Sequence, residues 1–363
     1  MRRSAMRSWV TGLLGAACSL ATATAGTPAS LDDQIFQAEE PSLVQQVSAE
    51  YATASAPVAS GKGARGHHGA GLNFFVGTEA VFLRPFQSGS APVVSNVNGA
   101  NVGGNEADDF YGAPRFWVGA GLDDSPLFFQ LQYWELNGSE TDTIVAPGPF
   151  GGTNFGSLRM NNFDFEGGAL LCLEGGRTEG KVTFGGRHTT FDTASGFSTM
   201  GFLSPTDTAS ASGSSYSAFE GTGLTTSLQL TRRIGDSDWR LFTGGRFSWL
   251  WGEDSNGALT SASVSDGISN ASSINGAFGG GDATMYIFEF QLGTQWQHRL
   301  KCLNADAFFR IAMEYQYWNT DSSSQALTGS FASLPGNSST VLASSRGFET
   351  NLFGVAIGTG LTW

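Results

Sequence analysis

From Leu72 to Trp363 the sequence alternates between apolar and polar residues with a period of two. This period is typical of a β-strand whose two faces meet different surroundings. We find ten such stretches, and the joins between them alternate strictly between short and long. The stretches cover residues 72–84, 113–122, 127–137, 161–173, 181–192, 216–231, 239–252, 284–297, 305–319 and 348–363.

An even number of strands with alternating short and long connections is the pattern of an outer-membrane barrel. We therefore predict an all-β fold, a transmembrane antiparallel up-and-down β-barrel of about ten strands over residues 71–363. Twelve strands are the alternative, if residues 253–283 contribute a further hairpin. The long loops would lie outside the cell, and both termini would lie in the periplasm.

The two faces of each predicted strand are unlike. In residues 305–319, Phe309, Ile311 and Met313 share one face, which we assign to lipid, while Arg310 and Glu314 share the other, which we assign to the lumen. A soluble antiparallel sheet also alternates. Its apolar face, however, has no reason to end in aromatic residues.

Aromatic residues close both ends of the apolar face in three predicted strands, ten positions apart in each. Ten residues of tilted strand rise about 25 Å, the height of a lipid-facing band between two aromatic girdles. We therefore predict girdle positions for Trp239 and Trp249, Tyr286 and Trp296, and Phe353 and Trp363.

The first 70 residues have a different character. Arg2, Arg3 and Arg7 precede the apolar residues 9–21 and the small-residue site 23–25, which predicts a secretory signal peptide over residues 1–25. Residues 26–70, which include His67 and His68, read as a flexible, acidic periplasmic segment.

The charge balance excludes one class of partner. Removal of the signal peptide takes three of the 19 basic residues and none of the 32 acidic ones, which leaves a net charge of −16. A nucleic-acid partner requires a basic face, so we expect none. Cys172 and Cys302 form at most one disulfide and lack metal-ligand spacing. After the signal peptide no apolar run approaches the roughly 18 residues of a membrane helix.

A belt of charged residues is predicted inside the barrel. The inward residues seven positions up each strand from its short-turn end are mostly charged. Neighbouring strands would juxtapose Glu79 with Arg115, Glu166 with Arg187, and Arg246 with Glu289. Opposed charges of this kind set selectivity in a pore, or neutralise one another and fill a narrow barrel. The predicted lumen or constriction residues are Glu79, Arg115, Trp134, Glu166, Arg187, Arg246, Glu289, Arg310 and Glu314.

Short motifs resemble a known family. Residues 113–119 (APRFWVG) and 130–136 (QLQYWEL), with 314–318 (EYQYW) and 358–363 (GTGLTW), are similar to the Legionella-type pore-forming outer-membrane proteins. The resemblance implies a pore for ions or small solutes. The aromatic end at Trp363 is also similar to the signal that the barrel-assembly machinery recognises, and the small residues Gly354, Ala356, Gly358 and Gly360 would leave one wall of the lumen thin.

Two other functions are weighed against a pore. The first is a non-conducting barrel that anchors and displays surface loops, although loops rich in Ser, Gly, Ala and Thr favour flexible shielding over binding. The second is an outer-membrane enzyme, which we do not expect because His188 has the parity of a lipid-facing or rim residue and no catalytic set can be assembled around it. Glu106, Asp108 and Asp109 lack the spacing of a calcium loop, and we expect neither metal nor cofactor.

Overall fold

The structure is a computed structural model in which a single compact unit, residues 52–363, holds all described residues. The described residues are 71–87, 94–97, 100–103, 109–122, 125–145, 150–173, 177–202, 204–321, 325–335, 337–347 and 349–363. The predicted signal peptide and acidic segment lie outside them. Within the described part of the chain, no helix is long and apolar enough to cross a membrane.

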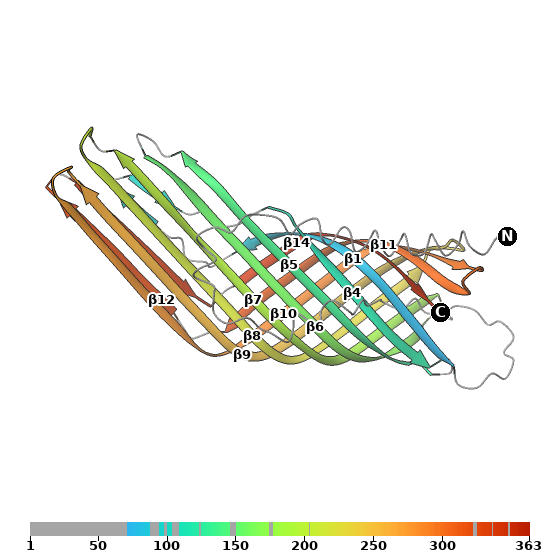
Figure 1. The fold of residues 1–363 in the computed structure, drawn as a ribbon. Coiled ribbons are helices and arrows are strands. Elements are labelled where there is room, and N and C mark those ends of the chain that lie inside the picture. The colour runs from blue at the N-terminus through green and yellow to red at the C-terminus, as the bar shows by residue number, and fades with distance from the viewer. Residues whose placement is uncertain are drawn as a thin grey trace, which may run out of the picture. The chain divides into compact units, whose positions relative to one another are not determined.

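Ten antiparallel strands close into a barrel in which each strand pairs with the preceding and following wall strands along the chain, and the first strand pairs with the last (Figure 1). Each stretch predicted from the sequence lies in a different wall strand, so the predicted ten-stranded up-and-down barrel is confirmed. The wall strands are β1 (Leu72–Gln87), β4 (Tyr111–Leu122), β5 (Leu127–Val145), β6 (Phe150–Leu173), β7 (Thr178–Phe202), β8 (Thr208–Arg233), β9 (Trp239–Ser265), β10 (Asn270–Leu300), β11 (Ala305–Asp321) and β14 (Glu349–Thr362).

The alternative of twelve wall strands is wrong. Residues 253–283 lengthen β9 and β10, which stay paired from Trp239 opposite Trp296 up to Ser265 opposite Asn270. Hairpins β5–β6 and β7–β8 are lengthened in the same way, so most of the predicted long loops in these hairpins are strand. A strand ladder is held by backbone hydrogen bonds, so small polar residues can extend it without the apolar alternation that the prediction relied on.

The three lengthened hairpins run on past the ends of β1, β4, β11 and β14 (Figure 1), and a second sheet lies against the inner faces of hairpins β7–β8 and β9–β10. The second sheet has the order β12 (Gln325–Leu334), β13 (Asn337–Arg346), β2 (Val94–Val97) and β3 (Ala100–Gly103). The buried residues between the two sheets are mostly alanines, and serine hydroxyls bond across them. Ser330 Oγ donates to the carbonyl of Thr260 at 2.9 Å and Ser339 Oγ to that of Ser210 at 3.1 Å. Hairpins β7–β8 and β9–β10 and the second sheet therefore form a two-layered β-sandwich beyond the barrel.

Burial alternates along the wall strands as the sequence predicts. Phe290 is 41% and Ile311 44% exposed on the outer face, whereas Arg310 is 4% and Glu314 1% exposed on the inner face. An outer band this apolar is stable against hydrocarbon and not against water, so the wall is built to span a membrane. Its exposed members include Phe129, Phe163, Phe165, Phe184, Leu224, Leu228, Leu241, Phe247, Phe288, Phe290, Leu292, Phe309, Ile311, Met313, Val355 and Ile357.

The six predicted girdle residues all face outward, and four of them form two cross-strand pairs. Trp239 lies opposite Trp296 near the short turns, and Trp249 lies opposite Tyr286 at the other end of the band, with ring centroids 6.3 Å apart. Phe353 and Trp363 are exposed on the outside of β14 and at its end. Near the short turns, Gly235 and Asn304 take positive φ, which these two residue types tolerate best.

Candidate functional site in the barrel interior

Apolar side chains fill the half of the lumen nearer the long hairpins. The ring of Trp134 on β5 stacks on that of Trp318 on β11 at 6.0 Å between centroids, and Phe191 on β7 lies 6.3 Å from Trp318. Each of these pairs comes from strands four places apart in the ten-stranded wall, so the rings meet across the lumen. We call this group the apolar plug: Leu83, Trp134, Leu136, Leu158, Met160, Phe191, Phe219, Leu250, Met285, Ile287, Trp318 and Leu352, each at most 2% exposed.

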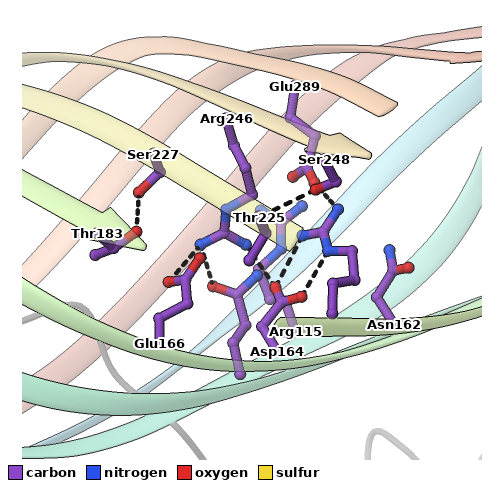
Figure 2. A network of polar contacts seen from close by, with 12 residues as sticks. Arg115, Asn162, Asp164, Glu166, Thr183, Thr225, Ser227, Arg246, Ser248 and Glu289 are labelled. Atoms are coloured by element: carbon purple, nitrogen blue, oxygen red, sulfur yellow. Dashed lines mark hydrogen bonds and ion pairs between the residues drawn. The ribbon is translucent and has the colours of Figure 1, made fainter. Parts of the chain in front are cut away.

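A charged layer lies next to the plug, on the side of the short turns. Figure 2 shows part of this layer. The whole layer contains five carboxylates and five cations, so its formal charge is balanced. Every side chain is largely buried, and the most exposed of the paired ones, Glu289, is 12% exposed. Members are Glu79, Asp164, Glu166, Glu289 and Glu314 with Arg115, Lys181, Arg187, Arg246 and Arg310.

One predicted pair is confirmed. Arg115 Nη1 donates to Glu79 Oε2 at 2.8 Å, and the two residues lie opposite each other on β4 and β1. Arg115 also reaches Glu314 on β11, three strands away, at 2.9 Å. Glu79 in turn accepts from Arg310. The guanidinium of Arg115 is therefore a bridge across part of the lumen.

Of the other two predicted juxtapositions, Arg246 with Glu289 is confirmed and Glu166 with Arg187 is wrong. The register places Asp164 opposite Arg187, where we expected Glu166, and Arg187 Nη2 donates to Asp164 Oδ2 at 2.8 Å and Nη1 to Glu289. Arg246 does lie opposite Glu289, as predicted, but its guanidinium crosses to Asp164 at 2.6 Å and Glu166 at 3.2 Å on β6 (Figure 2). Asp164 was missed, although it shares the inward parity of Glu166.

Aromatic residues close much of the short-turn end. Phe75, Trp117, Phe128 and Phe308 form a buried cluster, and the guanidinium of Arg310 lies 4.5 Å from the ring centre of Trp117. Lys181 was also missed by the sequence reasoning, although it begins one of the predicted strands. Its ammonium lies 4.9 Å from the ring centre of Phe128. The charged layer is thus enclosed between two apolar layers.

The thin wall that we expected on β14 is filled. Gly354, Ala356, Gly358 and Gly360 do face inward and are buried. The side chain of Glu79 occupies the space beside Gly358, and the ring of Phe308 occupies that beside Gly360. Neighbouring side chains have therefore taken up the room that small residues would have given to a pore.

A cavity lies within the charged layer. Its volume is about 80 Å³, and Arg115, Trp117, Lys181, Ser227, Gln229 and Arg246 are among the residues that line it. A space of this size and polarity holds a few water molecules or a small ion.

Other candidate residues lie away from the lumen. His188 faces outward, with Nδ1 3.2 Å from Thr222 Oγ1 and Nε2 3.9 Å from Glu220. Cys172 and Cys302 are free thiols on the surface. In the described ranges, no group of three or more His, Cys, Asp or Glu side chains is placed to hold a metal ion. Glu106 and Asp108 fall outside those ranges.

No protein-family model matches the sequence, and no curated protein matches it significantly. Among solved structures, the outer-membrane protease OmpT of Escherichia coli aligns with 80% of this chain and 96% of its own, at 13% identity and a TM-score of 0.34. The monoaromatic hydrocarbon channel CymD has 8% identity and a TM-score of 0.19, over 80% of this chain and 88% of its own. A Pseudomonas aeruginosa FadL homologue has 6% identity and a TM-score of 0.18, over 80% of this chain and 89% of its own. Structural similarity this low transfers no function to this chain.

Proposed function

We propose that this protein is an outer-membrane β-barrel with a closed lumen that anchors and displays its β-sandwich at the cell surface. Of the functions weighed from the sequence, this is the non-conducting anchor. The observation that carries it is the contact of Trp134, Trp318 and Phe191 across the lumen.

The outer surface supports the membrane part of the proposal. A closed barrel pairs every wall strand on both sides, which satisfies the backbone polar groups inside hydrocarbon. The apolar band and the paired aromatics at its two ends fit a bilayer. Short turns at one end and long hairpins at the other support an orientation in which the hairpins and the sandwich lie outside the cell.

The sandwich supports the display part. Flexible shielding loops would have no reason to pair as strands, yet β7 and β8 pair without a break from Thr178 opposite Arg232 to Phe202 opposite Thr208. Their inner face is covered by the second sheet through small buried residues and serine hydrogen bonds. The result is an ordered surface with a fixed shape, which suits presentation to a partner outside the cell.

A narrow pore is the second candidate, and the polar cavity favours it. The guanidinium of Arg246 lines that cavity and is 11% exposed, so an ion within it would meet a charged wall. A conducting path additionally requires the apolar plug to move aside. The plug is made of wall side chains, so movement would have to come from rotation of several rings.

Planar-bilayer recordings separate the two candidates. We expect no steady channel from the wild type and a new conductance from the double variant Trp134→Ala/Trp318→Ala, which removes two rings that meet in the plug. A steady wild-type channel would refute the closed lumen. Labelling of single cysteines in whole cells tests the display: Ser269→Cys at the tip of hairpin β9–β10 should react, and Asp236→Cys in the turn between β8 and β9 should not.

A further inference from the structure

We propose that the cavity in the charged layer is a binding site for a small monovalent anion of chloride size. The proposal concerns the charged layer alone and does not depend on whether the apolar plug opens. It rests on the residues around the cavity, on Lys181, and on buried donors without acceptors.

The lining of the cavity is cationic although the layer as a whole is neutral. Arg115, Lys181, Arg246 and Arg310 line it, while Glu289 is the one carboxylate among the described lining residues. The other four carboxylates of the layer do not line the cavity and are bound by arginines, as Glu79 and Glu314 are by Arg115. The positive charge is therefore concentrated around the empty space.

Lys181 is the single residue that most strongly indicates an anion site. Its side chain is largely buried, and its ammonium donates to the amide oxygen of Gln130 at 2.7 Å and lies over the rings of Phe75 and Phe128. None of the salt bridges among the described residues includes Lys181. An ammonium carries three donors, and a buried charge without a direct counter-charge is costly.

Two further buried donors in the lining lack acceptors. The indole N–H of Trp117 and the Nε–H of Arg115 have no hydrogen-bond partner, and both atoms are inaccessible to bulk solvent. Buried polar groups in folded proteins are nearly always paired. Water can accept from these donors, but only an anion would also offset the positive charge around the cavity. The available volume of about 80 Å³ suits a halide with accompanying water.

Anion dependence of the melting temperature tests this site. The full-length protein, folded in detergent, is compared in sodium gluconate and sodium chloride or bromide at constant sodium concentration. An anion that binds only the folded state stabilises it, so we expect a saturable rise in Tm of about 2 °C or more in halide. Bromide should also give an anomalous scattering peak inside the cavity in crystals.

Three variants assign the effect to the site. Lys181→Met keeps the side-chain length but removes the charge and should abolish the halide dependence. Trp117→Phe keeps a ring under Arg310, removes the N–H donor, and should raise the half-saturating halide concentration several-fold. Lys301→Met makes the same change as the first variant at an exposed turn and should behave as wild type.

Two results would overturn the proposal. Equal wild-type melting temperatures in gluconate and halide would mean that the cavity holds water alone. An unchanged halide dependence in Lys181→Met would place the anion elsewhere on the molecule. If Lys181→Met fails to fold, Trp117→Phe decides: an unchanged half-saturating concentration refutes the site, and a raised one supports it.

Discussion

Trp318→Ala tests whether the lumen is packed as tightly as the structure has it. The Trp318 side chain is fully buried, stacks on Trp134 and contacts Phe191, and its indole N–H donates to Gln316 Oε1 at 2.9 Å. A tryptophan of this kind buries about 200 Å², which at about 25 cal/mol per Å² amounts to about 5 kcal/mol. Large-to-small changes of this type cost about 3 to 5 kcal/mol in packed cores. We expect a loss in that range.

The measurement is equilibrium unfolding by guanidinium in lipid vesicles, with Trp251→Ala as the matched control. Trp251 is the same residue type on β9, but it faces outward and is 46% exposed, with one ring contact to Trp249. It should lose about half as much free energy of unfolding or less, because about half of its surface is already exposed. Equal losses of unfolding free energy in the two variants would refute a packed lumen, because a ring that already contacts water in a channel contributes little burial to stability.

Three further predictions follow from other parts of the molecule. Arg187→Ala should cost about 3 to 5 kcal/mol, because it removes the ion-pair partner of the buried Glu289 and one of the two arginines that bind Asp164. Arg299→Ala breaks an exposed pair with Asp306 and should cost about 1 kcal/mol or less. Similar values from unfolding curves would contradict the buried network. Phe290→Arg puts a charge in the lipid-facing band, which costs about 2 to 4 kcal/mol. It should impair barrel assembly, measured by heat-modifiable gel mobility, more than Gln291→Arg on the inner face does. The reverse order would mean that the two faces are assigned the wrong way round. Backbone N–H groups of Ser269 and Ile268 donate to the Asp266 carboxylate at 2.6 and 2.9 Å and hold its pKa below the usual 3.8. The stabilisation of the β9–β10 tip by this carboxylate is therefore present above pH 3.8 and is lost as pH falls through the lowered pKa. Protection of the Ile268 and Ser269 amides from hydrogen exchange should fall over that pH range in the wild type but not change with pH in Asp266→Asn.

The sequence by itself determined the ten wall strands and their faces. Successive side chains of a strand point to opposite sides, so the parity of a residue is a local property that needs no knowledge of neighbouring strands. This is why Glu79, Arg115, Arg187 and Glu314 were assigned to the interior, and why His188 was assigned outward. The aromatic girdle positions follow from the same count along single strands.

Register between strands was decided by the tertiary structure. A shift of two residues keeps every side chain on its face while changing its partner, so parity could not tell Asp164 from Glu166 as the partner of Arg187. The lengthening of the hairpins could not be predicted from the sequence for a related reason. Their small Ser, Gly, Ala and Thr residues have little apolar contrast, and only the second sheet, which comes from distant parts of the chain, gives their inner face something to pack against.

The filling of the lumen also depended on the closed barrel. Trp134 and Trp318 are far apart in the sequence and four strands apart in the wall, and their rings meet because ten strands leave an interior narrow enough for side chains to span. The same closeness lets Arg246 reach Asp164 three strands away and leaves Lys181 beside a cavity without a carboxylate within ion-pair distance. Distances across a barrel are set by strand number, tilt and stagger together, and no single strand encodes them.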